Sequence, residues 1–139
     1  MNDIRNIAFI GAGNMTQSIV GGMCKSGYPA DKVWVSNPSD AKLEKMKSEL
    51  GVNTSNDNLE VVNNADAIVL SVKPQLMAEV CAHLRENVHN LTDKLIITIA
   101  AGIRIPKYRE YLGENIRIIR VMPNTPSLVG QGMSGLVTD

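Results

Sequence analysis

Residues 7–16 read IAFIGAGNMT, and this stretch decides the fold. Its first four residues are apolar and end at Gly11, as in a strand that is buried on both faces of a sheet. After the turn, Met15, Ile19 and Met23 recur every four positions, which predicts the buried face of a helix. A strand that passes through a glycine turn into a helix is typical of a phosphate-binding βα unit.

The same alternation of strand and helix continues along the chain. Further apolar runs predict strands at residues 33–35, 52–54, 67–72, 95–99, 116–121 and 132–137. Caps, prolines and glycines predict helices over residues 14–26, between Ser39 and Gly51, after Asn56 or Asp57, from Pro74 to Val88, and over residues 106–112. Short connections between alternating elements predict an α/β fold with a doubly wound, mostly parallel sheet, Rossmann-like, in a single domain over residues 1–139.

Composition narrows the function classes. The 139 residues are 44% hydrophobic and 20% charged, which excludes a disordered chain. A formal net charge of zero gives no broad field for nucleic acid or an anionic membrane, and we expect neither as a partner. No apolar run reaches the roughly 18 residues of a membrane span. Two distant cysteines, two histidines and no export signal predict a cytoplasmic protein without a metal site or a disulfide framework.

The glycine turn has the residues that a diphosphate needs. Gly11 permits a tight turn, Gly13 lets a pyrophosphate approach the backbone, and the following helix offers free N–H groups. The third position of this fingerprint is normally Gly or Ala, but here it is Thr16, whose side chain we expect to turn aside from the packing contact. The alternative is a purely structural turn. Gly21 and Gly22 predict close packing of the helix on the sheet.

The end of the second strand bears on the choice of dinucleotide. An NAD site usually has Asp or Glu there, to bind the ribose hydroxyls. This chain has Ser36, Asn37 and Ser39, which can donate hydrogen bonds to a 2′-phosphate, and Lys42 adds a nearby cation. Asp40 is expected to face the next helix instead of the ribose. The pattern favours NADP(H), with NAD(H) as the alternative, or else a plain turn with a helix cap.

Three other strand ends carry unusual segments. They are residues 71–74 (Ser-Val-Lys-Pro), 100–102 (Ala-Ala-Gly) and 122–126 (Met-Pro-Asn-Thr-Pro). Each has a purely structural alternative: the first could be an ordinary helix start, the second a tight turn after a strand, and the third a rigid loop. Because ligands collect beyond the carboxyl ends of parallel strands, we expect all three to share one rim with the glycine turn.

Together, FIGAGNM at residues 9–15, VKP at 72–74, AAG at 100–102 and MPNTP at 122–126 resemble pyrroline-5-carboxylate reductase, in the same order and over nearly the whole chain. The resemblance implies an oxidoreductase that reduces 1-pyrroline-5-carboxylate to proline with NADPH or NADH, the last step of proline synthesis. It implies cofactor contacts along the glycine turn (Gly11, Ala12, Gly13, Asn14, Met15 and Thr16), on the adenosine side (Asn37 and Asn58) and on the nicotinamide side (Ser71, Val72, Lys73, Pro74, Ala100, Ala101, Gly102 and Asn124).

The resemblance also implies a second, all-helical domain that builds a homo-oligomer and supplies the substrate pocket and a proton-donating hydroxyl. The sequence ends at Asp139, before such a domain, so we expect a fragment that binds nucleotide and is inactive alone. No catalytic residue is assigned in it. The alternatives are the cofactor domain of a related reductase for another small acid, a stand-alone nucleotide-sensing module, and a methyltransferase of similar topology.

Overall fold

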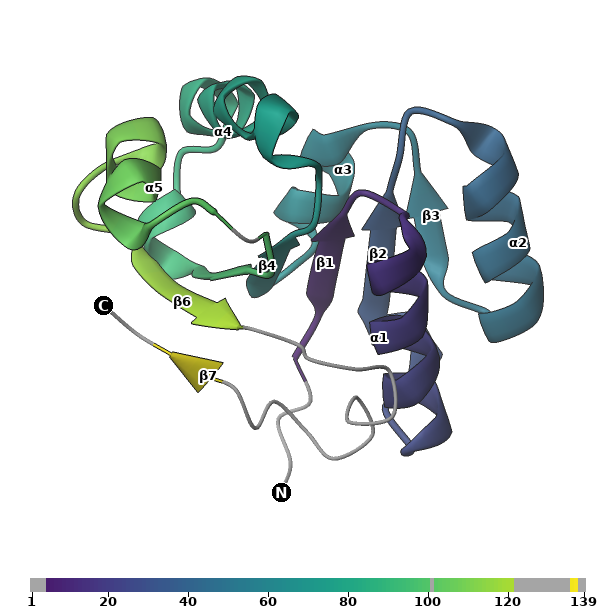
Figure 1. Ribbon diagram of the computed structural model, residues 1–139. Helices are drawn as coiled ribbons and strands as arrows, with labels where there is room; N and C mark the ends of the chain where they lie inside the picture. The colour runs from purple at the N-terminus through teal and green to yellow at the C-terminus, as the bar shows by residue number, and fades with distance from the viewer. Residues whose placement is uncertain (1–4, 101, 122–135, 138–139) are drawn as a thin grey trace.

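The computed structural model describes residues 5–100, 102–121 and 136–137 as one α/β unit around a seven-stranded sheet (Figure 1). The strand order is β3-β2-β1-β4-β5-β6-β7. The strands are β1 (Ile7–Ile10), β2 (Val33–Ser36), β3 (Asn53–Ser55), β4 (Ala67–Leu70), β5 (Leu95–Thr98), β6 (Arg117–Val121) and β7 (Leu136–Val137). Strands β1 to β6 are parallel, and β7 pairs antiparallel with β6. The predicted doubly wound, mostly parallel sheet is confirmed.

Helices cover both faces of this sheet. They are α1 (Asn14–Lys25), α2 (Asp40–Leu50), α3 (Asn58–Asn63), α4 (Pro74–Asn87) and α5 (Ile105–Leu112), with two single turns, η1 (Ala30–Lys32) and η2 (Leu91–Asp93). Successive side chains of β1 point alternately to the two faces of the sheet. Phe9 packs with α1 and α2, whereas Ala8 and Ile10 pack with α3, α4 and α5. Burial of aliphatic side chains on both faces explains why the strands read as continuous apolar runs.

The predicted buried face of α1 is confirmed for Ile19, which is buried, and for Met23, which is partly buried against the same core, but it is wrong for Met15. Met15 is 43% exposed, and the buried residues are Thr16, Ile19 and Val20. The buried residues of α1 are spaced at i, i+3 and i+4 from Thr16. Because successive residues of an α-helix are rotated by about 100°, Met15 points about 100° away from this buried face. The close packing predicted at Gly21 is also wrong, because no atom lies within 4 Å of the position that a Cβ would take there.

Several boundaries differ from the predictions by one or two residues. β4 ends at Leu70 and β5 at Thr98, both earlier than their apolar runs suggest. Of the last predicted strand, residues 132–137, only Leu136 and Val137 lie among the described residues, and they form β7. The predicted cap of α3 is confirmed at Asp57, whose carboxylate accepts a hydrogen bond from the N–H of Leu59 at 3.0 Å. Ser39 occupies the N-cap position of α2, as predicted, but its side chain makes no capping hydrogen bond.

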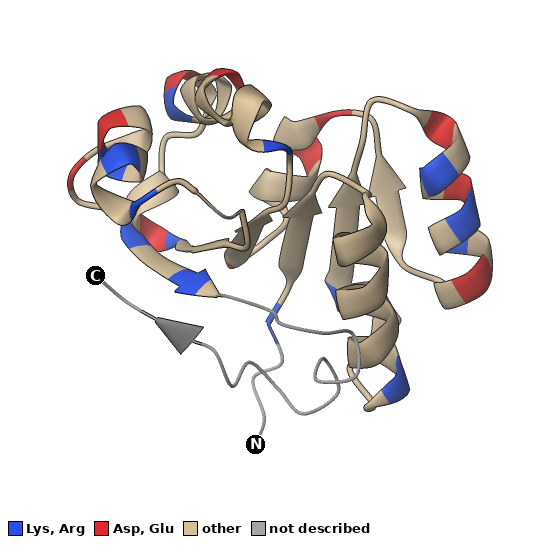
Figure 2. Cartoon of the chain, viewed as in Figure 1, with Lys and Arg blue, Asp and Glu red and all other residues tan. Residues whose placement is uncertain are grey.

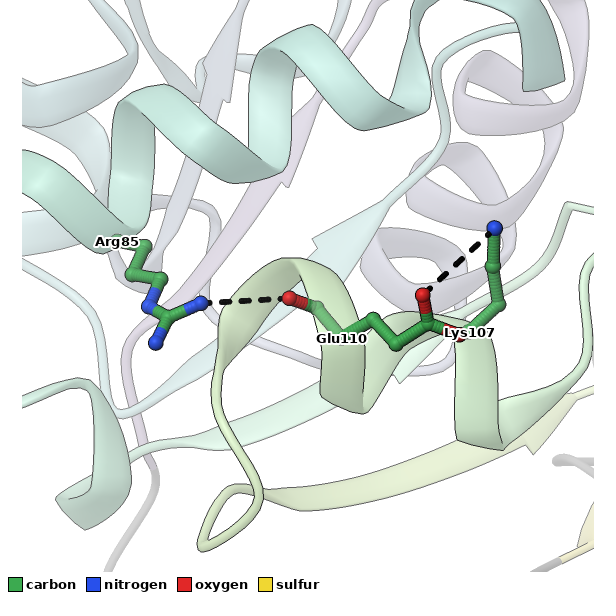
Figure 3. A network of polar contacts seen from close by, with 3 residues as sticks. All are labelled: Arg85, Lys107 and Glu110. Carbon is green, nitrogen blue, oxygen red and sulfur yellow. Dashed lines mark hydrogen bonds and ion pairs between the residues drawn. The ribbon is translucent and has the colours of Figure 1, made fainter.

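Charged residues of both signs alternate along α2, α4 and α5 (Figure 2), and most of them are exposed. Where α4 meets α5, Arg85 donates to the carbonyl of Glu110 at 3.3 Å, and Lys107 lies 3.8 Å from the Glu110 carboxylate (Figure 3). These groups are exposed, so their contribution to stability is at most about 1 kcal/mol.

None of the helices within the described ranges combines the length and the apolar character that crossing a bilayer requires. In the same part of the chain, no three His, Cys, Asp or Glu side chains gather as ligands of a metal ion do.

Candidate nucleotide-binding site

A cleft of about 480 Å³ opens at the carboxyl edge of the three central strands. β1 lies between β2 and β4, and the chain leaves these strands on opposite sides, which is the point where ligands bind in open α/β sheets. The cleft is lined by Ile10, Gly11, Ala12, Gly13, Ser36, Asn37, Pro38, Lys42, Asn58, Ser71, Val72, Lys73, Leu76, Glu79 and Val80. Of the three segments predicted to share one rim with the glycine turn, the β4 exit lines this cleft, and residues 36–38 at the carboxyl end of β2 line it as well.

The two glycines of the turn have different reasons to be glycine. Gly11 has φ +104°, and a Cβ there would lie 2.9 Å from the carbonyl oxygen of Ser71. Gly13 has φ −74°, which any residue adopts, and no atom lies within 4 Å of its missing Cβ. Neither strain nor packing inside the chain therefore requires glycine at position 13. An open backbone beside the cleft fits a ligand that approaches the main chain closely.

The start of α1 is suited to an anion. Gly13 is its N-cap without a side-chain hydrogen bond, and its first turn contains no acidic residue. The N–H groups and the positive end of the helix dipole can therefore act on a bound phosphate. The turn itself is held by the Gln17 side chain, which donates to the carbonyl of Ala12 at 3.0 Å.

Asn37 connects the β2 exit to the glycine turn. Its Oδ1 accepts a hydrogen bond from the N–H of Ala12 at 3.1 Å, and its Nδ2 donates to the carbonyl of Ser39 at 3.2 Å. One amide of the turn is therefore engaged by a side chain that itself lines the cleft. The resemblance predicts that Asn37 lies near the cofactor, whereas its bond to Ala12 follows only from the folded chain.

Ser36 does not offer the free donor that its position suggested. Its side chain is fully buried, and its hydroxyl donates to Oδ1 of Asn58 at 2.6 Å. Asn58 lines the cleft and retains its amide N–H groups as donors. Asp40 accepts a hydrogen bond from Asn56 at 2.8 Å and is not among the cleft residues, as expected. Lys42 is exposed and borders the cleft from α2.

Thr16 also differs from its prediction. Its side chain is fully buried and does not turn aside. Its hydroxyl lies 2.7 Å from the carbonyl oxygen of Gly11 and 2.8 Å from Oγ of Ser71. A fingerprint position that normally tolerates only a small residue holds threonine here because its hydroxyl finds two partners at the contact.

The β4 exit supplies Ser71, Val72 and Lys73 to the cleft, and Pro74 begins α4. Sequence reasoning missed the residues that follow, Leu76 and Glu79. Leu76 is 45% exposed. An apolar residue that lies outside the buried face of α4 is the sequence signal that could have indicated a ligand contact there.

The β5 exit lies one strand farther along the sheet, and Ala100 and Gly102 do not line the cleft. Ala101 and Asn124 lie outside the described residues.

A buried hydrogen bond lies below the β5 exit. The Tyr108 hydroxyl lies 2.6 Å from Oγ1 of Thr98, which also accepts a hydrogen bond from the N–H of Ala100 at 3.3 Å. Burial raises the pKa of Tyr108, so its hydroxyl is a neutral anchor.

The family described as "NADP oxidoreductase coenzyme F420-dependent" matches residues 6–102. The chain is 46% identical to a pyrroline-5-carboxylate reductase of Vibrio alginolyticus over 132 residues, which are 95% of this chain and 48% of that protein. It is 37% identical to the Escherichia coli reductase over 133 residues, with coverage of 95% and 49%. The chain thus spans about half the length of these curated relatives.

Solved structures agree in fold. A pyrroline-5-carboxylate reductase from Coxiella burnetii has a TM-score of 0.85 at 41% identity, over 91% of this chain and 47% of that one. A Plasmodium falciparum pyrroline carboxylate reductase with NADP bound has a TM-score of 0.76 at 30% identity, over 91% and 45% of the two chains.

Proposed function

The chain belongs to the family described as NADP oxidoreductase, coenzyme F420-dependent, and from this premise we propose that it is the NADP(H)-binding part of a pyrroline-5-carboxylate reductase. The enzyme would reduce 1-pyrroline-5-carboxylate to L-proline. The observation that carries the proposal is Gly13, a glycine that lines the cleft with an ordinary φ and open space where its side chain would be.

The dinucleotide would lie across the cleft with its diphosphate over residues 11–13 and the start of α1. The N–H groups of Gly11 and Ala12 already donate to Ser36 and Asn37, so the N–H groups at the start of α1 and the helix dipole would stabilise the negative charge. The absence of a side chain at Gly13 lets the phosphates come within hydrogen-bond distance of the backbone.

The adenosine side would lie against Asn37, Asn58 and Lys42. No Asp or Glu from the β2 exit lines the cleft, so a 2′-phosphate meets no repulsion there, and Lys42 supplies a positive charge. These features, together with the NADP-bound relative, support NADP(H) over NAD(H).

NADPH, when bound, would supply the hydride that reduces the imine. The chain would bind and orient it from the β4 exit (Ser71, Val72, Lys73 and Pro74), while Ala100, Ala101, Gly102 and Asn124 remain predicted contacts of the nicotinamide half. A protein contributes position and electrostatics to such a transfer, and the chemistry belongs to the cofactor. The proposed substrate is a small molecule. The proposed compartment is the cytoplasm, which is consistent with two free cysteines. Self-association through a further helical part stays a prediction.

Cofactor binding can be measured directly because Trp34 is the single tryptophan of the chain and lies in β2, two residues before Ser36 of the cleft. Energy transfer from Trp34 to the nicotinamide should rise with added NADPH and saturate, with weaker binding for NADH. Gly13→Glu should abolish the signal, because a carboxylate would occupy the diphosphate position. Equal titration curves for Gly13→Glu and the unaltered chain would contradict the proposed site.

The reaction can be tested by joining residues 1–139 to the second half of the Vibrio alginolyticus reductase. The chimera should oxidise NADPH in the presence of 1-pyrroline-5-carboxylate and form proline, and Gly13→Glu should remove this turnover. A folded chimera that binds NADPH but forms no proline would contradict the proposed reaction and leave cofactor binding intact.

A further inference from the structure

Two hydroxyl groups from distant parts of the chain meet beneath the cleft. Thr16 belongs to the first turn of α1, and Ser71 follows β4, 55 residues later. Oγ1 of Thr16 lies 2.8 Å from Oγ of Ser71, and the two side chains also reach the carbonyl oxygens of Gly11 and Ile10, at 2.7 Å and 2.9 Å respectively.

The two hydroxyls share two protons among four short contacts, one of them between Ser71 Oγ and the carbonyl oxygen of Gly11 at 3.2 Å, so the contacts alternate as hydrogen bonds. Each hydroxyl has one proton to donate and can accept further bonds. Ser71 donates to the carbonyl of Ile10 or of Gly11, and Thr16 donates either to the carbonyl of Gly11 or to Ser71. Because Thr16 is fully buried, water cannot replace these partners if the hydroxyl is removed.

The backbone is tight at the same place. The missing Cβ of Gly11 would lie 2.9 Å from the carbonyl oxygen of Ser71, so the glycine turn and the β4 exit are in direct contact. A small residue at position 16, as the fingerprint normally has, would leave this contact without a hydrogen bond from α1.

We infer that Thr16 and Ser71 form a positioning pair that fixes the glycine turn relative to the β4 exit. The inference rests on the proposed function, in which the diphosphate binds one of these segments and the nicotinamide half binds the other. The pair sets the spacing between them before the ligand arrives, so a ligand that spans both segments benefits and one that stays on the adenosine side does not.

The test compares two ligands. NADPH spans both segments, whereas 2′,5′-ADP carries only the adenosine side. Thr16→Val removes the hydroxyl and keeps the shape, while Thr16→Ser keeps the hydroxyl. Calorimetric titration should show NADPH binding weakened about 5- to 10-fold in Thr16→Val, which corresponds to the loss of one hydrogen bond. Binding of 2′,5′-ADP should change less than about 2-fold, and Thr16→Ser should bind both ligands like the unaltered chain.

Ser71→Ala supplies the matched half of a double-mutant cycle. In the Ser71→Ala background, the further loss caused by Thr16→Val should be smaller than in the unaltered chain. Thr16→Ala, the residue typical of the fingerprint, serves as the second variant if Thr16→Val does not fold.

The outcomes separate the two claims. Equal weakening of NADPH and 2′,5′-ADP, or a Thr16→Ser variant as weak as Thr16→Val, would overturn the positioning pair alone. Failure of the unaltered chain to bind NADPH would overturn the proposed function, and this inference with it.

Discussion

The N–H of Ala12 donates a hydrogen bond to Oδ1 of Asn37 at 3.1 Å, although 25 residues separate them in the sequence. The bond joins the turn after β1 to the turn after β2, so the segments expected to hold the diphosphate and the adenosine phosphate are one unit. A substitution that keeps this bond and adds a negative charge, at the cost of the Nδ2 donation to Ser39, should therefore test cofactor choice.

Asn37→Asp is that substitution. An aspartate retains an oxygen to accept the Ala12 N–H, and it adds a negative charge where the 2′-phosphate is expected. NADPH should bind about 10-fold more weakly or worse, while NADH binding should be unchanged or improved. Titration of both cofactors by energy transfer from Trp34 measures this. Asn90→Asp, which adds the same charge far from the cleft, is the control, and an equal loss for both cofactors in Asn37→Asp would contradict the assignment.

Gly11→Ala should mainly lower stability, whereas Gly13→Ala should mainly weaken NADPH binding. At Gly11 the backbone has φ +104° and the new methyl meets the carbonyl oxygen of Ser71, so the free energy of unfolding should fall by about 2–4 kcal/mol. At Gly13 the methyl faces open space, so stability should change by no more than about 1 kcal/mol while NADPH binding weakens. Urea unfolding and NADPH titration on both variants provide the check. A Gly13→Ala variant with undiminished affinity would argue against close approach of the diphosphate.

Tyr108→Phe tests the anchor beneath the β5 exit. The phenol hydroxyl and Thr98 are both fully buried and 2.6 Å apart, so removing it leaves the Thr98 hydroxyl with one partner fewer. The free energy of unfolding should decrease by about 1–2 kcal/mol. Tyr111→Phe keeps the neighbouring edge-to-face ring contact and should change stability by less than about 0.5 kcal/mol. Similar small changes in both variants would mean that the buried bond contributes little.

Stability should decrease at alkaline pH because of Cys81. Burial raises the pKa of its thiol from 9.0 to about 12, so between these values the unfolded chain releases a proton that the folded chain retains. The thiol's contribution to stability is therefore complete below pH 9 and is lost as the pH rises toward 12. The expected slope is at most about 1.4 kcal/mol per pH unit.

Urea unfolding at several pH values, compared between the unaltered chain and Cys81→Ala, isolates this slope from that of other groups. Cys24→Ala is the control, since burial raises the pKa of Cys24 as well but leaves its side chain partly exposed. If Cys81→Ala keeps the full alkaline slope, the buried thiol is not its source.

The sequence predicts the sheet and the glycine turn because both depend on local pattern. An apolar run such as residues 7–10 can be satisfied only inside a covered sheet, and Gly11 and Gly13 follow it at the spacing that a phosphate turn uses. The four segments that resemble the reductase family were recognisable for the same reason, since each is contiguous.

The polar contacts across the cleft were not predictable. Thr16 was expected to turn aside, but Ser71 lies opposite it once β4 pairs with β1, and no local signal gives that distance. Ser36 was expected to be a free donor, and only the placement of α3 shows that Asn58 takes its proton. Side-chain hydrogen bonds between remote segments depend on where the backbones come to rest, which pattern alone does not specify.

The central place of β1 has a consequence for synthesis on the ribosome. Ile10 pairs with Ser36 on one side and with Leu70 on the other, so β1 keeps an unpaired edge until some sixty further residues have been translated. During that interval β1 exposes unpaired backbone N–H and C=O groups together with apolar side chains, which favours aggregation. A chaperone that shields β1 would therefore be needed most before β4 has left the exit tunnel.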